Sequence, residues 1–257
     1  MFSVQHFIWL GICLVLFICA IMLYQKKKPS LNKVLDICII ICVLSEVTKV
    51  LSVLEMVPSA NGEIMRPYIP MNHLPLHMCS IDIILIYLAR HTKNAETREN
   101  LLAYLYPTCL YGSLLALAMP SIFTTSISVD QAFTHPMAYQ FFIYHTMIGS
   151  LSAFIVMSKE IKWEMKHYLN SLKYLFLMGF VSIYINSMLA SPTYVDGKLI
   201  SVDFWPNFFF TYNNPLGIKV TTEIGWRIYL LIIGAVAALL IFLCFVPLLF
   251  RKKKKAE

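Results

Sequence analysis

Residues 7–24 read FIWLGICLVLFICAIMLY, an apolar run without a charged side chain, and Lys26, Lys27 and Lys28 follow shortly behind it. A run of this length is typical of a transmembrane helix, because about 20 helical residues cross the hydrocarbon core of a bilayer. A cleaved signal peptide is the alternative, but its cations would precede the apolar run. The residues before this run contain no Lys or Arg. We therefore expect a first membrane helix that is retained.

Further apolar runs follow along the chain. Of its 257 residues, 58% are hydrophobic and 14% are charged, whereas soluble domains carry about 25% charged residues. The sequence therefore predicts an all-α integral membrane protein, with residues 1–257 forming a single bundle of seven transmembrane helices. The expected spans are residues 7–24, 34–54, 73–89, 101–119, 139–158, 168–190 and 226–250.

The Lys and Arg residues predict the orientation of this bundle. Most of the 21 cations follow the first, third, fifth and seventh spans. By the positive-inside rule, the N-terminus is expected outside and the C-terminus inside a plasma (inner) membrane. Because these clusters explain most of the net charge of +7, we expect no nucleic-acid partner. The run from Arg251 to Lys255 is expected to contact anionic lipid headgroups.

Two features concern the cysteines and the loops. All seven cysteines lie within expected spans, so no disulfide framework is expected. Two outer loops are long, residues 120–138 and 191–222. The second contains an aromatic, proline-broken stretch, residues 204–215, which is expected to lie at the membrane interface or to fold back over the bundle.

Polar side chains within the spans gather in the outer half of the bilayer. At 1.5 Å per residue, Cys79 and His145 are each expected about 9 Å deep, Glu46 about 12 Å and Asn186 about 6 Å. Because polar groups are costly in lipid, their depth predicts a functional layer. Small or polar residues with helical spacing predict the inward faces of spans two, five and six, and for the Ser, Gly and Cys members we favour a role in helix packing alone. The residues are Cys38, Cys42, Ser45, Lys49 and Ser52; His145, Gly149 and Ser152; and Gly179, Ser182 and Asn186.

Span three carries two candidate sites on opposite faces. A step of 100° per residue places Cys79 with Asp82 and Ile86, and it places His77 and Ser80 nearly opposite, together with His73. Pro75 suits the first turn of such a helix, where a missing N–H has no cost. If the helix begins at Pro75, His73 belongs to the preceding loop.

Three kinds of chemistry fit these residues. In the first, His145 takes the proton of Cys79, Asp82 or Glu46 orients the imidazole, and the thiolate forms a thioester with an acyl group. In the second, His73 and His77 bind a metal with help from Glu46 or His145. In the third, the chain is a transporter or receptor with an intramembrane polar site. That site would comprise Glu46, Lys49, Asp82 and Asn186.

A resemblance to a known family bears on this choice. The run from Leu74 to Ser80, Leu-Pro-Leu-His-Met-Cys-Ser, resembles the Pro-Leu-His-Leu-Cys signature of the bacterial YwaF-type integral membrane proteins. These are related to the eukaryotic transmembrane protein 164 acyltransferases. Further points of resemblance are the Glu46-x-x-Lys49 pair, His145, and the element of Asn207, Phe208, Phe209, Phe210 and Pro215. Met78 replaces the usual leucine, and Phe208 replaces a tyrosine.

The resemblance implies a seven-helix fold and acyl transfer to or from phospholipids through Cys79 and His145. We therefore predict a membrane-embedded lipid acyltransferase, or an acyl hydrolase if water is the acceptor. No cofactor motif is visible, and no metal is expected in this mechanism. Polar groups that would bind the lipid headgroup or stabilise the developing oxyanion are His77, Ser80, Lys49, Asn186 and Asn207.

Overall fold

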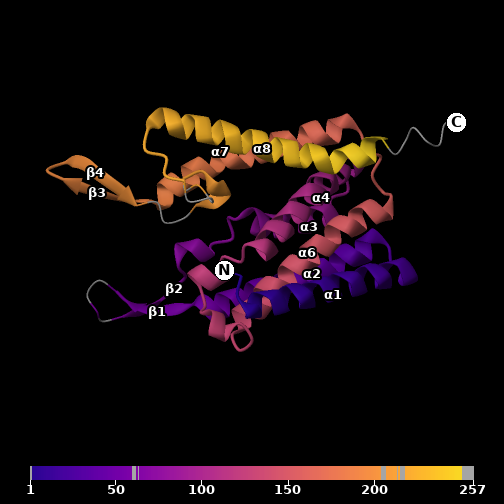
Figure 1. Ribbon diagram of the computed structural model, residues 1–257, viewed down its shortest axis with the longest axis horizontal. Helices are drawn as coiled ribbons and strands as arrows, with labels where there is room; N and C mark the ends of the chain where they lie inside the picture. The colour runs from indigo at the N-terminus through magenta and orange to yellow at the C-terminus, as the bar shows by residue number, and fades with distance from the viewer. Residues whose placement is uncertain are drawn as a thin grey trace. The chain divides into compact units, whose positions relative to one another are not determined.

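The computed structural model describes residues 2–59, 62, 64–203, 207–212, 214 and 218–250 (Figure 1). The run from Arg251 to Lys255, predicted to contact lipid headgroups, lies outside the described residues, as does Pro215. The chain forms two compact units. The first comprises Met1–His73 and Cys79–Lys162, and the second comprises Leu74–Met78 and Trp163–Glu257.

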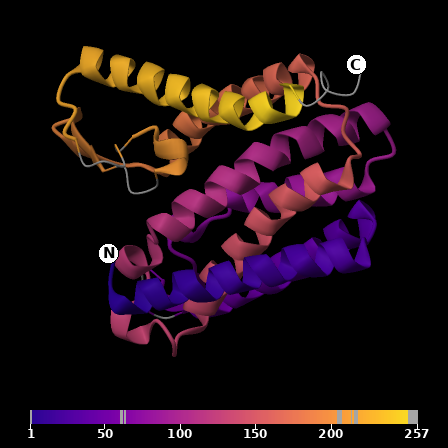
Figure 2. The same cartoon turned by 45° about the vertical axis from the view of Figure 1, so that its right-hand side comes forward.

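The first unit is a helical bundle built around α6 (Pro136–Ser158). Three helices pack against α6: α1 (Val4–Lys27), α2 (Leu31–Val53) and α4 (Ala95–Ala118). Within this unit, these helices run alongside one another in both Figure 1 and Figure 2. The unit is completed by α3 (Met78–His91), the short α5 (Ile122–Thr125) and the 3-10 turn η2 (Val129–Gln131).

The second unit is a helical hairpin of α7 (Met165–Leu189) and α8 (Glu223–Phe250) (Figure 1). At one end, the ring of Tyr168 packs edge-on against Phe242 and Phe245, and Trp163 also contacts Phe245. At the other end, the 3-10 turn η3 (Phe208–Phe210) packs against α7. The second long loop thus folds back onto its own helices over its described residues 207–212, one of the two placements expected for it.

Capping residues begin the long helices where the apolar runs start. Ser3, Ser30 and Asn94 are the N-caps of α1, α2 and α4, and their side chains accept backbone N–H bonds of 3.2, 3.4 and 2.9 Å. Pro136 occupies the first turn of α6, where its missing N–H has no cost. These signals fix the helix starts locally, because each cap satisfies a backbone N–H that the helix leaves free.

The helices confirm a multi-pass membrane protein. Within the described part of the chain, six helical stretches are long and apolar enough to cross a membrane. The remaining expected span corresponds to α2, a 23-residue helix that also carries Lys33, Asp36, Glu46 and Lys49. Its predicted inward stripe is confirmed at Cys38, Cys42 and Ser45, which are buried.

The expected third span, residues 73–89, lies within the apolar stretch Met71–His91, but its α-helix begins later than predicted. Residues Met71–His73 form the 3-10 turn η1, a turn follows at residues 74–77, and α3 begins only at Met78. Pro75 restricts the residue before it to extended backbone, which disfavours a helix through this segment. Its neighbours instead close a turn in which the Leu76 N–H bonds the Leu74 carbonyl at 2.8 Å. His73 and His77 therefore precede the helix and do not share a helical face.

Two β-hairpins lie in connections between the expected spans, a departure from the all-α prediction. The first pairs β1 (Glu55–Pro58) with β2 (Met65–Tyr68), and the second pairs β3 (Ser191–Val195) with β4 (Lys198–Asp203). Both are antiparallel and mostly exposed. Each joins the ends of helices in its own unit.

Candidate functional site

Cys79 is the second residue of α3, and a neighbouring helix holds its backbone. The phenol of Tyr144, on α6, donates a hydrogen bond to the carbonyl oxygen of Cys79. Tyr144 is only 4% exposed, so this contact is made away from the surface. The Cys79 side chain is half-buried, and its thiol is free of disulfides. The structure thereby fixes the first turn of α3 against α6.

Asp82, one turn further along α3, is fully buried at 0% exposure. Its partners are on α4: Thr108 Oγ1 lies 3.1 Å from Asp82 Oδ1, and Cys109 Sγ lies 3.6 Å from Asp82 Oδ2. No Lys, Arg or His forms an ion pair with Asp82 in the described part of the chain. Ile86 is also buried, which confirms that the face shared by Asp82 and Ile86 points into the bundle.

The hydroxyl of Thr108 can serve either charge state of this carboxyl group. It lies 3.0 Å from the carbonyl oxygen of Tyr104, one turn earlier on α4. Because a hydroxyl has a single proton, Thr108 either donates to Asp82 or donates to Tyr104 and accepts from a protonated Asp82. The polar groups around Asp82 are therefore satisfied without a cation.

His145 directly follows Tyr144 on α6 and is 8% exposed. Its Nδ1 atom lies 2.7 Å from the carbonyl oxygen of Phe141. A carbonyl oxygen only accepts hydrogen bonds, so Nδ1 carries the proton of the neutral ring and Nε2 keeps a free electron pair. A backbone carbonyl thus occupies the position expected for Asp82 or Glu46. No hydrogen bond joins His145 to the Cys79 thiol among the described residues.

Glu46 and Lys49 neutralise each other on α2. Lys49 Nζ lies 2.7 Å from Glu46 Oε2, and the two side chains are 27% and 12% exposed, Glu46 being the more exposed. This i,i+3 pair offers no free charge for a transport pathway.

Ser80, the third residue of α3, is half-buried and makes no hydrogen bond within the described part of the chain.

The remaining predicted binding residues belong to the second unit. Asn186, on α7, is 0% exposed and holds η3: its Oδ1 accepts from the Phe208 N–H at 3.1 Å. Its Nδ2 donates to the Phe208 carbonyl at 3.1 Å and to Thr211 Oγ1 at 2.8 Å. Asn207 Oδ1 accepts from the Tyr212 N–H at 3.0 Å. Both amides therefore order this loop.

His77 also belongs to the second unit, where its ring packs edge-on against Phe208 with centroids 4.8 Å apart. The 74–80 motif is thus divided, because residues Leu74–Met78 group with α7 and α8, and Cys79 groups with the first unit. For the metal alternative, no three His, Cys, Asp or Glu side chains form a possible metal-ion cluster among the described residues.

Sequence reasoning missed three residues of the Cys79 region: Tyr144, Thr108 and Cys109. All three are polar or polarizable and lie within expected spans. Because polar side chains are costly in lipid, their presence in a span was the signal that could have identified them. Nothing in their spacing indicated their partners, because the partners of Thr108 and Cys109 are on α3, and Tyr144 bonds a backbone atom.

Comparison with known proteins gives one match. The model of the TMEM164 family matches residues 1–246, a region that contains Cys79, Asp82 and His145. No curated protein and no solved structure matches the chain significantly. Because the match extends over most of both units, the chain belongs to the TMEM164 family.

Proposed function

We propose that this protein is a membrane-embedded enzyme that transfers or hydrolyses phospholipid acyl groups, with Cys79 as nucleophile and His145 as its base. One observation carries the proposal: Tyr144, the residue before His145, hydrogen-bonds the backbone of Cys79. This contact places the α6 segment that carries the base beside the first turn of α3. Membership of the TMEM164 family and the resemblance to acyltransferases of this type support the same chemistry.

The reaction has two steps. In the first, His145 Nε2 takes the Cys79 proton, and the sulfur attacks the ester carbonyl of a phospholipid. The tetrahedral intermediate then expels the lysolipid oxygen, which receives the proton from His145, and a thioester remains on Cys79. In the second, an acceptor hydroxyl gives its proton to His145 and attacks the thioester, which regenerates the thiol. Water as acceptor yields a free fatty acid.

The start of α3 favours this chemistry electrostatically. The first-turn N–H groups of a helix have no partner within the helix, and Cys79 is in that turn. They stabilise negative charge, both on a thiolate and on the oxyanion of the tetrahedral intermediate. The Phe141 carbonyl orients His145. In this proposal Asp82 does not contact the reacting atoms. It holds α3 to α4 one helical turn after Cys79.

The proposed topology has seven spans, with α2 as the second. The Glu46–Lys49 ion pair lowers the cost of placing α2 in the bilayer, because each charge is compensated. With the N-terminus outside, Cys79 and His145 lie in the outer half of a plasma (inner) membrane. Within the first unit, Ser80 and Lys49 are the proposed contacts for a phospholipid headgroup. His77, Asn186 and Asn207 of the second unit are proposed separately as polar contacts for a headgroup.

The test is lipid remodelling by purified protein in nanodiscs that contain an isotope-labelled phospholipid and a lysolipid acceptor. We expect Cys79→Ser to lower turnover by at least about 10³-fold, as loss of a nucleophile does. His145→Ala should lower it by about 10²- to 10⁴-fold. Cys19→Ser is the matched control, because Cys19 is an exposed thiol on α1. Turnover that survives Cys79→Ser and His145→Ala unchanged contradicts the proposal.

A further inference from the structure

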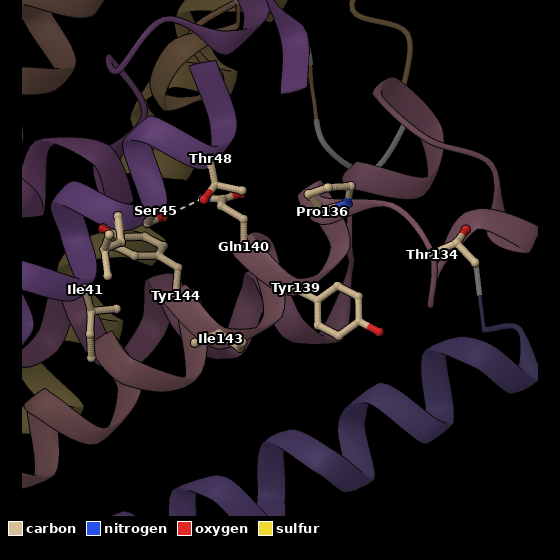
Figure 3. A pocket seen from close by; sticks show the side chains of 10 residues that line it. Ile41, Ser45, Thr48, Thr134, Pro136, Tyr139, Gln140, Ile143 and Tyr144 are labelled. Atoms are coloured by element: carbon tan, nitrogen blue, oxygen red, sulfur yellow. Dashed lines mark hydrogen bonds between the residues drawn. The ribbon is translucent and has the colours of Figure 1, made fainter. Parts of the chain in front are cut away.

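A groove of about 480 Å³ opens between α2 and α6 in the first unit (Figure 3). Its walls include Ile41 and Leu44 of α2 and Ile143 and Tyr144 of α6, and Thr134 and Pro136 line it near the start of α6. The volume lies within the range of about 300–1,000 Å³ typical of small-ligand sites. Cys79 and His145 are not among the lining residues.

We infer that this groove binds one acyl chain and the adjoining ester of a glycerophospholipid from the surrounding leaflet. The first argument is location. Leu44 and Ile143 are 60% and 43% exposed. In the proposed topology α2 and α6 both cross the bilayer, so we place the mouth of the groove in lipid. The second is charge: none of the ten lining residues is Asp, Glu, Lys, Arg or His. The occupant is therefore a neutral, mainly apolar group.

We assign the ester to the hydrogen-bonded pair of Gln140 and Ser45; the hydroxyl-bearing residues Thr48, Thr134, Tyr139 and Tyr144 also line the groove. Figure 3 shows Gln140 of α6 facing Ser45 of α2, and Gln140 Nε2 donates to Ser45 Oγ at 2.7 Å. The second N–H and the carbonyl oxygen of Gln140 have no partner among the described residues. They are therefore available to a ligand, and the N–H suits the carbonyl oxygen of an ester.

With the start of α6 placed at the outer edge of the interfacial layer, this pair lies at the depth of a phospholipid ester. Gln140 lies four residues beyond Pro136, the first residue of α6, which is about 6 Å along the helix. The interfacial layer on each side of the hydrocarbon core is about 5–8 Å thick. Below Gln140, the groove is lined by Ile143 and Ile41, which suits the methylene chain.

Tyr144 links this groove to the proposed chemistry. Its ring is part of the groove wall, and its phenol donates to the carbonyl of Cys79. A bound chain therefore packs against the side chain that positions the nucleophile. This inference rests on the proposed function for the fate of the lipid, but the binding itself does not require turnover.

The experiment is photo-crosslinking in nanodiscs made of a phosphatidylcholine with a diazirine in the middle of one acyl chain, with the labelled sites mapped by mass spectrometry. We expect labelling of Leu44 and Ile143 to exceed that of Ile40 by about tenfold, the effect of a modest site preference over surrounding lipid. Ile40 is the matched comparison, because it is 60% exposed on α2, like Leu44, but does not line the groove.

Two variants sharpen the test. Leu44→Trp should fill the groove and lower the labelling of Ile143, whereas Ile40→Trp should leave it unchanged. Cys79→Ser should leave the labelling pattern intact. Uniform labelling of exposed α2 and α6 side chains would contradict lipid binding in the groove, even if turnover depends on Cys79. Groove-specific labelling in a protein whose turnover does not need Cys79 instead overturns the proposed function alone.

Discussion

Asn186→Leu should release the loop that carries η3. The substitution keeps the number and branching of the side-chain heavy atoms but removes three hydrogen bonds, to the Phe208 N–H, the Phe208 carbonyl and the Thr211 hydroxyl. At about 1 kcal/mol each, their loss costs about 3 kcal/mol. The Phe208 N–H then has no remaining partner within the described residues, and Phe208 is 1% exposed. The penalty therefore cannot be recovered by contact with solvent unless the loop opens.

Hydrogen–deuterium exchange mass spectrometry in nanodiscs measures this opening directly. A loss of about 3 kcal/mol predicts exchange about 100-fold faster at Phe208. Ser187→Ala is the matched control on the same helix, since it removes two exposed contacts, with the Ile183 carbonyl and the Tyr212 hydroxyl. It should change exchange by no more than about twofold. If exchange at Phe208 is unaffected in Asn186→Leu, Asn186 does not hold the loop.

Three further predictions concern the first unit. A Cβ on Gly149 would lie 2.6 Å from Ser113 Oγ, whereas Gly179 has open space; Gly149→Ala should therefore destabilise the protein by about 1–3 kcal/mol, and Gly179→Ala should be neutral or stabilising in thermal unfolding. Asp82→Asn should preserve stability because an amide can still bond Thr108 and Cys109, whereas Asp82→Leu should cost about 1–3 kcal/mol. Tyr144→Phe removes the hydrogen bond to the Cys79 carbonyl and should cost about 1 kcal/mol of stability. It should also lower kcat by about 10- to 100-fold with little change in KM. An unchanged kcat would show that Tyr144 does not position Cys79.

Much of the fold could be predicted because lipid imposes simple constraints. Uncharged runs such as residues 7–24 have few alternatives to a membrane helix. Helical spacing identified buried positions such as Cys38 and Asp82, since a polar residue in a span is stable mainly inside a bundle. The start of α3 was misplaced because Pro75 was assigned to the first helical turn, whereas it lies in the turn before α3.

The hairpins differ in how far their sequences could reveal them. Asp196 and Gly197 form a two-residue turn with φ values of 50° and 73°, between strands paired at Val195 and Lys198. An Asp-Gly pair between apolar segments is a strong hairpin signal that was available in the sequence. The strands of the first hairpin, Glu55–Pro58 and Met65–Tyr68, each contain a proline, which is disfavoured in strands. These two strands are therefore recognised only from their pairing in the structure.

The candidate site was less accessible to sequence reasoning. The residue types were informative, because a thiol, a carboxyl group and an imidazole are unusual in lipid. Their partners were not, since the hydrogen bond from Tyr144 goes to a backbone carbonyl and that of His145 goes to Phe141 on its own helix. Backbone acceptors are present at every position, so spacing alone cannot identify which one a side chain will contact.

The most direct test of the nucleophilic role of Cys79 is intact-mass analysis of the protein after brief incubation with a phospholipid. If Cys79 is the nucleophile, the mass of the protein increases by one acyl group, which peptide mapping locates on Cys79 and hydroxylamine removes, because hydroxylamine cleaves thioesters. The adduct should persist in Cys19→Ser and disappear in Cys79→Ala, together with turnover. Lipid turnover without an adduct on Cys79, or full turnover by Cys79→Ala, would show that Cys79 is not the nucleophile.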